Sequence, residues 1–201
     1  MSKIILLNGC GSSGKSSIAK SIQHLSNDVW ITFGIDTFID MLPTNKQELY
    51  FKFIPDQNER GATMRVESGP DAAKFFSAMP KFAAMLADKG NNIVIDEVFL
   101  DELDLKAYVE ILKDHTVYYI GVFCDLNVMQ EREILRGDRC IGLSNDQIDR
   151  VHQGVLGAYD FSVDTTNLSP FEAARQIMQF ITYNPTPQAF QSMIKVLTNI
   201  N

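Results

Sequence analysis

The chain has 201 residues, of which 45% are hydrophobic and 21% charged, and its formal net charge is -7. This size and composition predict one globular domain with a large core. The chain is acidic and has no block of Lys or Arg, which argues against nucleic acid and anionic membranes as partners. We therefore expect a small-molecule ligand.

The N-terminus and the cysteines indicate the compartment. Met1-Ser2-Lys3 leads into only four apolar residues, too few for a signal peptide, and no stretch approaches membrane-spanning length. Cys10, Cys124 and Cys140 are odd in number and lack the close pairing of zinc or redox motifs. We therefore expect a cytoplasmic protein whose cysteines serve as small apolar residues.

A glycine-rich loop follows the first expected strand, residues 3–8, and precedes an expected helix over residues 15–26. The pattern is G-x-x-x-x-G-K-S, the Walker A motif, whose backbone N–H groups surround phosphate oxygens at a helix N-terminus. Lys15 adds a positive charge, and Ser16 can ligate Mg²⁺. A chance glycine-rich turn is the alternative, and the strand and helix context argues against it. The candidate nucleotide-binding residues are Gly9, Cys10, Gly11, Ser12, Ser13, Gly14, Lys15, Ser16 and Ser17.

The second expected strand, residues 30–34, leads directly into Asp36. At the carboxyl end of this strand, a carboxylate would face the γ-phosphate and could accept the proton of an attacking hydroxyl. Asp36 could instead cap a short helix over residues 37–41. We favour the catalytic interpretation, because this strand end faces the predicted nucleotide site.

A hairpin is predicted between residues 44 and 69, where the strand–helix alternation is interrupted. Residues 50–54 and 63–66 have strand patterns, and residues 55–61 form the predicted turn. An insertion over about residues 44–74 would overhang the catalytic edge as an acceptor-pocket cap. A plain surface loop fits the composition equally well.

After an expected helix over residues 71–88, an apolar strand over residues 92–96 ends in two acids, the Walker B form. Asp96 continues the strand and is the predicted Mg²⁺ ligand. Glu97 could instead orient the substrate or a water molecule bound to Mg²⁺. A solvated strand end is the weaker alternative.

The second half continues the alternation, with strands expected over residues 117–124 and 161–163 and helices over 102–113, 127–136, 145–154 and 170–183. Such alternation predicts an α/β fold with a parallel sheet covered on both faces. Arg132, Arg136 and Arg139 cluster at a helix end. Alone they would suggest a solvated basic face, but beside the other motifs they predict a lid over about residues 132–154 that neutralises transferred charge.

The tail after Pro185 and Pro187, residues 185–201, has apolar residues at helical spacing. We expect a C-terminal helical extension that packs on the chain's own core. A homodimer contact is the less favoured alternative.

Together these motifs resemble the chloramphenicol phosphotransferase family over most of the chain. The phosphate loop is common to many families, whereas the FGxDxxIxxxP, Arg-Gly-Asp-Arg and Val-His-x-Gly segments are far more specific. The segments that carry the resemblance are residues 8–9, 33–43, 95–100, 121–125, 132–139, 151–155 and 163–166. The chain departs from the family in three places. Residues 44–74 show little similarity to it, and the residues beyond 183 are an extension. In the phosphate loop, Cys10-Gly11 stands where family members more often carry Gly-Ser.

The resemblance implies a three-layer P-loop kinase fold with a five-stranded parallel sheet, and an enzyme that uses ATP and Mg²⁺ to phosphorylate a hydroxyl of a small molecule. The family's type member inactivates the antibiotic chloramphenicol in this way. Carried over by position, Asp36 is the base and residues 9–16 are the phosphate loop, in which Lys15 holds the β- and γ-phosphates. Arg132, Arg136 and Arg139 are the lid that closes over ATP and stabilises the transferred group. Thr166 and Asn167 would border the adenine.

Two other classes compete with a kinase. A nucleotide-dependent binding switch would use the same loop, but Asp36 and the insertion argue against it. A GTPase is less favoured, because Asn45-Lys46-Gln47-Glu48 only superficially resembles a guanine-reading N-K-x-D and precedes the Walker B strand.

Overall fold

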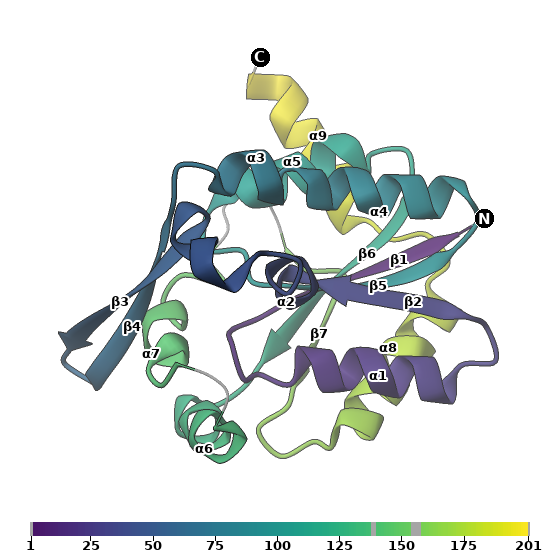
Figure 1. The fold of residues 1–201 in the computed structure, drawn as a ribbon. Coiled ribbons are helices and arrows are strands. Elements are labelled where there is room, and N and C mark those ends of the chain that lie inside the picture. The colour runs from purple at the N-terminus through teal and green to yellow at the C-terminus, as the bar shows by residue number, and fades with distance from the viewer. Residues whose placement is uncertain (1, 138–139, 154–157, 201) are drawn as a thin grey trace.

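A five-stranded parallel sheet forms the centre of the computed structural model, which describes residues 2–137, 140–153 and 158–200. Its strand order is β2-β5-β1-β6-β7 (Figure 1). The strands are β1 (Lys3–Asn8), β2 (Trp30–Gly34), β5 (Asn92–Glu97), β6 (Thr116–Phe123) and β7 (Phe161–Asp164). All five expected strands are thus present, within one residue at each end, and the expected α/β class is confirmed.

Helices cover both faces of this sheet (Figure 1). One face carries α1 (Lys15–Leu25) and α8 (Pro170–Tyr183), and the other carries α4 (Ala78–Asp88), α5 (Glu102–Ile111) and α9 (Ala189–Ile200). The single helix expected over residues 71–88 is divided at Ser77 into α3 (Ala72–Phe76) and α4. Within the described residues, no helix is both long and apolar enough to cross a bilayer.

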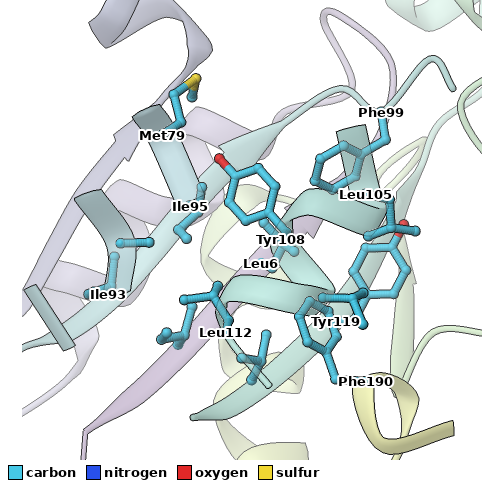
Figure 2. Close-up of a cluster of buried hydrophobic side chains, with 14 of the residues drawn as sticks. Leu6, Met79, Ile93, Ile95, Phe99, Leu105, Tyr108, Leu112, Tyr119 and Phe190 are labelled. Carbon is cyan, nitrogen blue, oxygen red and sulfur yellow. The ribbon is translucent and has the colours of Figure 1, made fainter. Parts of the chain in front are cut away.

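The core lies in two layers because successive residues of each strand point to opposite faces. Ile4 and Leu6 of β1 join one cluster, whereas Ile5 and Leu7 join the other, and all four are fully buried. This explains the continuous apolar runs of the central strands. In the first cluster, strand side chains pack against α5 and against Phe190 of α9 (Figure 2).

The tail packs through α9 onto the sheet, with Phe190 and Met193 buried. Its entry is fixed by Asp160, whose Oδ1 accepts hydrogen bonds from the backbone N–H groups of Gln188 at 2.6 Å and Ala189 at 2.8 Å. The other carboxylate oxygen accepts from Tyr119 N on β6 at 2.9 Å. One side chain therefore ties the helix start to the sheet.

The expected hairpin is present as β3 (Phe51–Asn58) and β4 (Gly61–Ser68), after α2 (Ile35–Ile39) and the 3₁₀ helix η1 (Thr44–Leu49). Its turn is shorter than predicted, because β3 continues through Pro55, which pairs with Met64. The hairpin is a sheet of two strands, so β3 has an open edge where a residue without an N–H group is tolerated.

Among the described residues between β6 and β7 are two helices, α6 (Leu126–Arg136) and α7 (Leu143–Gln147). The prediction of one helix over residues 145–154 is wrong in its bounds; Gly154 lies outside the described residues. The helix starts early because the Glu133 carboxylate of α6 accepts from Gly142 N at 3.0 Å and Ser144 N at 2.7 Å. This long-range cap satisfies backbone groups that a helix start leaves unpaired.

Candidate active site

The phosphate loop connects the end of β1 to α1, as expected. Gly14 precedes the helix with φ +97°, and Ser12 also has a positive φ of 62°. A side chain at Gly9 could not fit, because its Cβ would lie 2.3 Å from Val122 O on β6. The loop therefore depends on glycine both for its turn and for its close approach to the sheet.

Lys15 lies beneath the loop, only 5% exposed. Its Nζ donates hydrogen bonds to Gly9 O at 2.9 Å and Cys10 O at 2.8 Å, and it lies 3.5 Å from Asp96 Oδ1. The ammonium group is thus held at the phosphate-binding loop by two carbonyl oxygens and one carboxylate.

Ser16 and Asp96 meet across the loop. Ser16 Oγ donates to Asp96 Oδ2 at 2.5 Å, so a hydroxyl and a carboxylate oxygen from the two Walker motifs lie together. Such oxygens suit Mg²⁺, which binds one or two protein groups and completes its shell with water and phosphate. The predicted metal ligands therefore have the chemistry that this cation needs.

Asp36 lies in the first turn of α2, two residues beyond Gly34, which occupies the N-cap position. Asp36 therefore does not occupy the N-cap position that was its alternative role. Together with Lys15, Asp96 and Arg136, Asp36 lines one cavity. The residues around it are Ser12, Gly14, Lys15, Ser16, Ser17, Ile35, Asp36, Asp96, Val98 and Arg136.

Arg132 binds the outer side of the loop. Its guanidinium donates to Ser12 O at 3.4 Å, to Thr165 O at 2.8 Å and to Cys124 Sγ at 3.3 Å. Thr165 Oγ1 in turn donates to Ser13 O at 2.6 Å. The arginine and the end of β7 thus support the loop together.

The other predicted residues lie apart from that cavity. Thr166 and Asn167 follow the same end of β7, where Thr166 Oγ1 accepts from Asp125 N at 2.8 Å. Gly9, Cys10, Gly11 and Ser13 belong to the loop but do not line the cavity. Arg139 lies outside the described residues.

Glu97 points away from Asp96, because neighbouring residues of a strand face opposite sides. It is 5% exposed and accepts a hydrogen bond from Tyr108 Oη of α5 at 2.7 Å (Tyr108 is drawn in Figure 2). Burial raises the pKa of Glu97 to about 8. Its side chain belongs to the α5 face of the sheet, whereas Asp96 faces the phosphate loop.

Behind the loop lies a polar network that sequence reasoning missed. Asn8 Nδ2 donates to Tyr159 Oη at 2.8 Å and to Val151 O at 3.0 Å, and Asn8 Oδ1 accepts from Phe99 N at 2.9 Å. His152 Nδ1 lies 2.8 Å from Tyr159 Oη. Burial, and secondarily the charge of Lys15, lower the pKa of His152 to about 4. A neutral imidazole thus sits behind the loop that holds Lys15.

Gln147 was also missed, because the sequence gives no signal for it. Its Oε1 accepts a hydrogen bond from Gly11 N in the phosphate loop at 2.6 Å, across 136 residues of chain. The segment between β6 and β7 therefore contacts the loop through an uncharged side chain as well as through Arg132.

A comparison with protein families matches residues 2–182 to the chloramphenicol phosphotransferase-like proteins. Candidate O-phosphotransferases from two strains of Mycobacterium tuberculosis are each 28% identical over 200 residues, covering 96% of this chain and 88% of theirs.

Solved structures show the same fold. The APS kinase of Mycobacterium tuberculosis, in complex with AMPPNP and APS, has a TM-score of 0.62 at 14% identity and covers 90% of this chain and 98% of its own. Shikimate kinase from Acinetobacter baumannii, in complex with shikimate, has a TM-score of 0.57 at 11% identity and covers 92% of this chain and 95% of its own. The expected kinase fold is confirmed.

Proposed function

Since the chain belongs to the chloramphenicol phosphotransferase-like family, we propose that it is an ATP- and Mg²⁺-dependent O-phosphotransferase acting on a hydroxyl of a small molecule. One observation carries the proposal: the loop lysine, Asp36, Asp96 and Arg136 line one cavity. Phosphoryl transfer needs a cradle for phosphates, a base and positive charge around the transferred group, and these side chains supply all three.

The residues divide these tasks. Lys15 and the loop amides bind the phosphates of ATP, while Arg136 neutralises charge that develops on the γ-phosphoryl group. Arg139 is assigned the same role from its place in the sequence. Ser16 and Asp96 would hold Mg²⁺, which when bound neutralises phosphate oxygens. As the acceptor oxygen bonds to the γ-phosphorus, the bond from phosphorus to the bridging oxygen of ADP breaks. Asp36 takes the hydroxyl proton.

The acceptor would bind beneath the β3–β4 hairpin, the part of the insertion that projects from the sheet edge (Figure 1). The family's named substrate, chloramphenicol, is the first compound to test. The segment over residues 44–74 diverges from the family's signatures, so an acceptor with a different shape is equally compatible with the shared chemistry.

Mass spectrometry provides the test. The protein is incubated with Mg-ATP, chloramphenicol and a pool of hydroxylated metabolites, and the products are searched for a phosphoryl mass gain that a Lys15→Ala variant does not produce. Phosphorylated chloramphenicol would support the family's named activity, and a gain on another compound would support a different acceptor. No phosphorylated product together with an ATP-dependent protein partner would favour the binding switch instead.

Asp36→Asn separates chemistry from binding. We expect transfer to fall by at least about 100-fold, as for a lost general base, while ATP affinity stays near that of the wild type. Asp40→Asn is the matched control, since Asp40 is exposed at the end of the same helix and does not line the cavity. Equal turnover in Asp36→Asn and the control would remove Asp36 from the mechanism.

A further inference from the structure

The last residue of α7, Gln147, is buried against the phosphate loop, with 6% of its surface exposed. Its Oε1 accepts a hydrogen bond from Gly11 N at 2.6 Å. The carbonyl of that same peptide unit, Cys10 O, accepts the bond from Lys15 Nζ at 2.8 Å. One peptide group of the loop is therefore held by the loop lysine at one end and by a lid side chain at the other.

These two hydrogen bonds constrain one orientation of the peptide. In a trans peptide the C=O and N–H point in opposite directions, so Gln147 and Lys15 lie on opposite sides of it. Hydrogen bonds in such a chain polarise and strengthen one another when they are buried. A rotation of this peptide would break both bonds at once, so Gln147 helps to determine where the ammonium group of Lys15 rests.

The position of Gln147 is in turn set by the β3–β4 hairpin. Met64 N donates to Gly142 O at 3.1 Å, and Asn145 Nδ2 donates to Ala62 O at 3.0 Å. Arg60 at the hairpin turn donates through Nε to Asn145 Oδ1 at 3.0 Å and forms an ion pair with Asp149. Figure 1 shows α7 lying between the hairpin and α6. Hairpin and α7 are therefore joined by backbone and side-chain bonds.

We propose that Gln147 is a positioning residue for nucleotide binding. By holding the Cys10–Gly11 peptide it sets the phosphate loop and Lys15 in a binding-ready arrangement, and the hairpin keeps Gln147 in place. This inference rests on the nucleotide site of the proposed function. It links the segment assigned to the acceptor with the loop assigned to ATP, although neither the loop motif nor the hairpin pattern suggests such a connection.

The test measures the affinity for Mg-ADP by calorimetry. Gln147→Met removes the acceptor at similar length, and Gln147→Asn keeps the amide but is one methylene too short to reach Gly11. Both variants should bind Mg-ADP about tenfold more weakly, the value of one buried hydrogen bond. Gln176→Met is the matched control, because Gln176 is exposed on α8, and its affinity should match that of the wild type. Thermal unfolding of every variant checks that binding is measured on folded protein.

A double-mutant cycle separates positioning from general support. If Gln147 acts through Lys15, the Gln147→Met change should cost less than about threefold in a Lys15→Ala background. The same tenfold loss there, or wild-type affinity in either Gln147 variant, would overturn the proposal. Arg60→Ala should weaken binding in the same direction by a smaller factor, and unchanged affinity would overturn the role of the hairpin. Absence of Mg-ADP binding to the wild type would instead contradict the proposed function itself.

Discussion

Gly34 is the position where we expect a small substitution to disturb the proposed metal ligands, Ser16 and Asp96, most. It ends β2 and pairs in register with Asp96 on β5. Its backbone is extended, with φ -166° and ψ -171°, a conformation open to any residue. The constraint is space, since a Cβ at Gly34 would lie 2.3 Å from Asp96 O and 2.9 Å from Asp96 Cβ.

The size of the disturbance follows from these contacts. The Cβ would lie about 1 Å closer to Asp96 O than the 3.4 Å at which ordinary contact begins, so β2 and β5 must separate by a comparable amount. Such overpacking costs about 1–3 kcal/mol of stability. Asp96 would shift relative to Ser16, and Mg²⁺ tolerates little departure from its near-octahedral geometry. We expect Gly34→Ala to raise the Mg²⁺ concentration for half-maximal nucleotide binding at least about tenfold.

Calorimetric titration of ADP at a series of Mg²⁺ concentrations measures this effect. Gly90→Ala is the matched control, because Gly90 precedes the opposite end of β5 and a Cβ there meets nothing within 4 Å. With φ +86°, that change costs about 1–2 kcal/mol of backbone strain, so stability falls without altering the site. An unchanged Mg²⁺ dependence in Gly34→Ala would refute the reasoning that close strand packing sets the position of Asp96.

Three further predictions concern residues that support the site or hold the C-terminal helix. Because the folded protein lowers the pKa of His152 from 6.5 to about 4, its neutral form stabilises the fold above pH 6.5, and this contribution is lost as pH falls toward 4. Between pH 7 and pH 4, the free energy of unfolding of the wild type should fall by about 1–2 kcal/mol more than that of His152→Asn, after allowance for solvent screening. Urea unfolding at a series of pH values measures this difference, and parallel pH profiles of the two proteins would contradict it. Glu133→Gln weakens the cap of α7 and should lower the free energy of unfolding by about 2 kcal/mol. It should also weaken Mg-ADP binding measured by calorimetry, and retained affinity would show that the loop does not depend on this cap. Asp160→Ala should make the chain more sensitive to proteolysis near residue 188, where α9 begins, and leave Mg-ADP affinity unchanged. A cleavage rate equal to that of the wild type would contradict the role of Asp160 in holding α9.

The sheet and the loop were predictable because their signals are local. Each strand is a short run of β-branched and apolar residues, and the phosphate loop needs glycines at fixed spacing between a strand and a helix. The carboxyl ends of parallel strands meet at one edge, which brings Asp36 and Asp96 to the loop. Local alternation also distinguishes Asp96 from Glu97: the two neighbours point to opposite faces, and only Asp96 faces Ser16.

Other features depend on distant partners and therefore left no pattern. The start of α7 is fixed by Glu133 on another helix, so the sequence of residues 142–144 alone does not predict it. Pro55 ordinarily indicates a turn, yet the open edge of β3 accepts it within a strand. Gln147 resembles any polar helix residue until the fold brings it to Gly11.

The contacts of α7 also limit how freely the β3–β4 hairpin, the proposed acceptor segment, can change. Arg60 and Ala62 of the hairpin bind Asn145, two residues before Gln147, and Gln147 itself binds the loop. A substitution that reshapes the hairpin would therefore change the position of Gln147 and of the phosphate loop, unless the backbone at residues 60–64 keeps its place. Backbone groups carry two of these bonds, from Met64 N and to Ala62 O, and such bonds survive most side-chain changes. Hairpin side chains could thus change on an unaltered backbone path, which would let the proposed acceptor preference vary while the loop keeps its position.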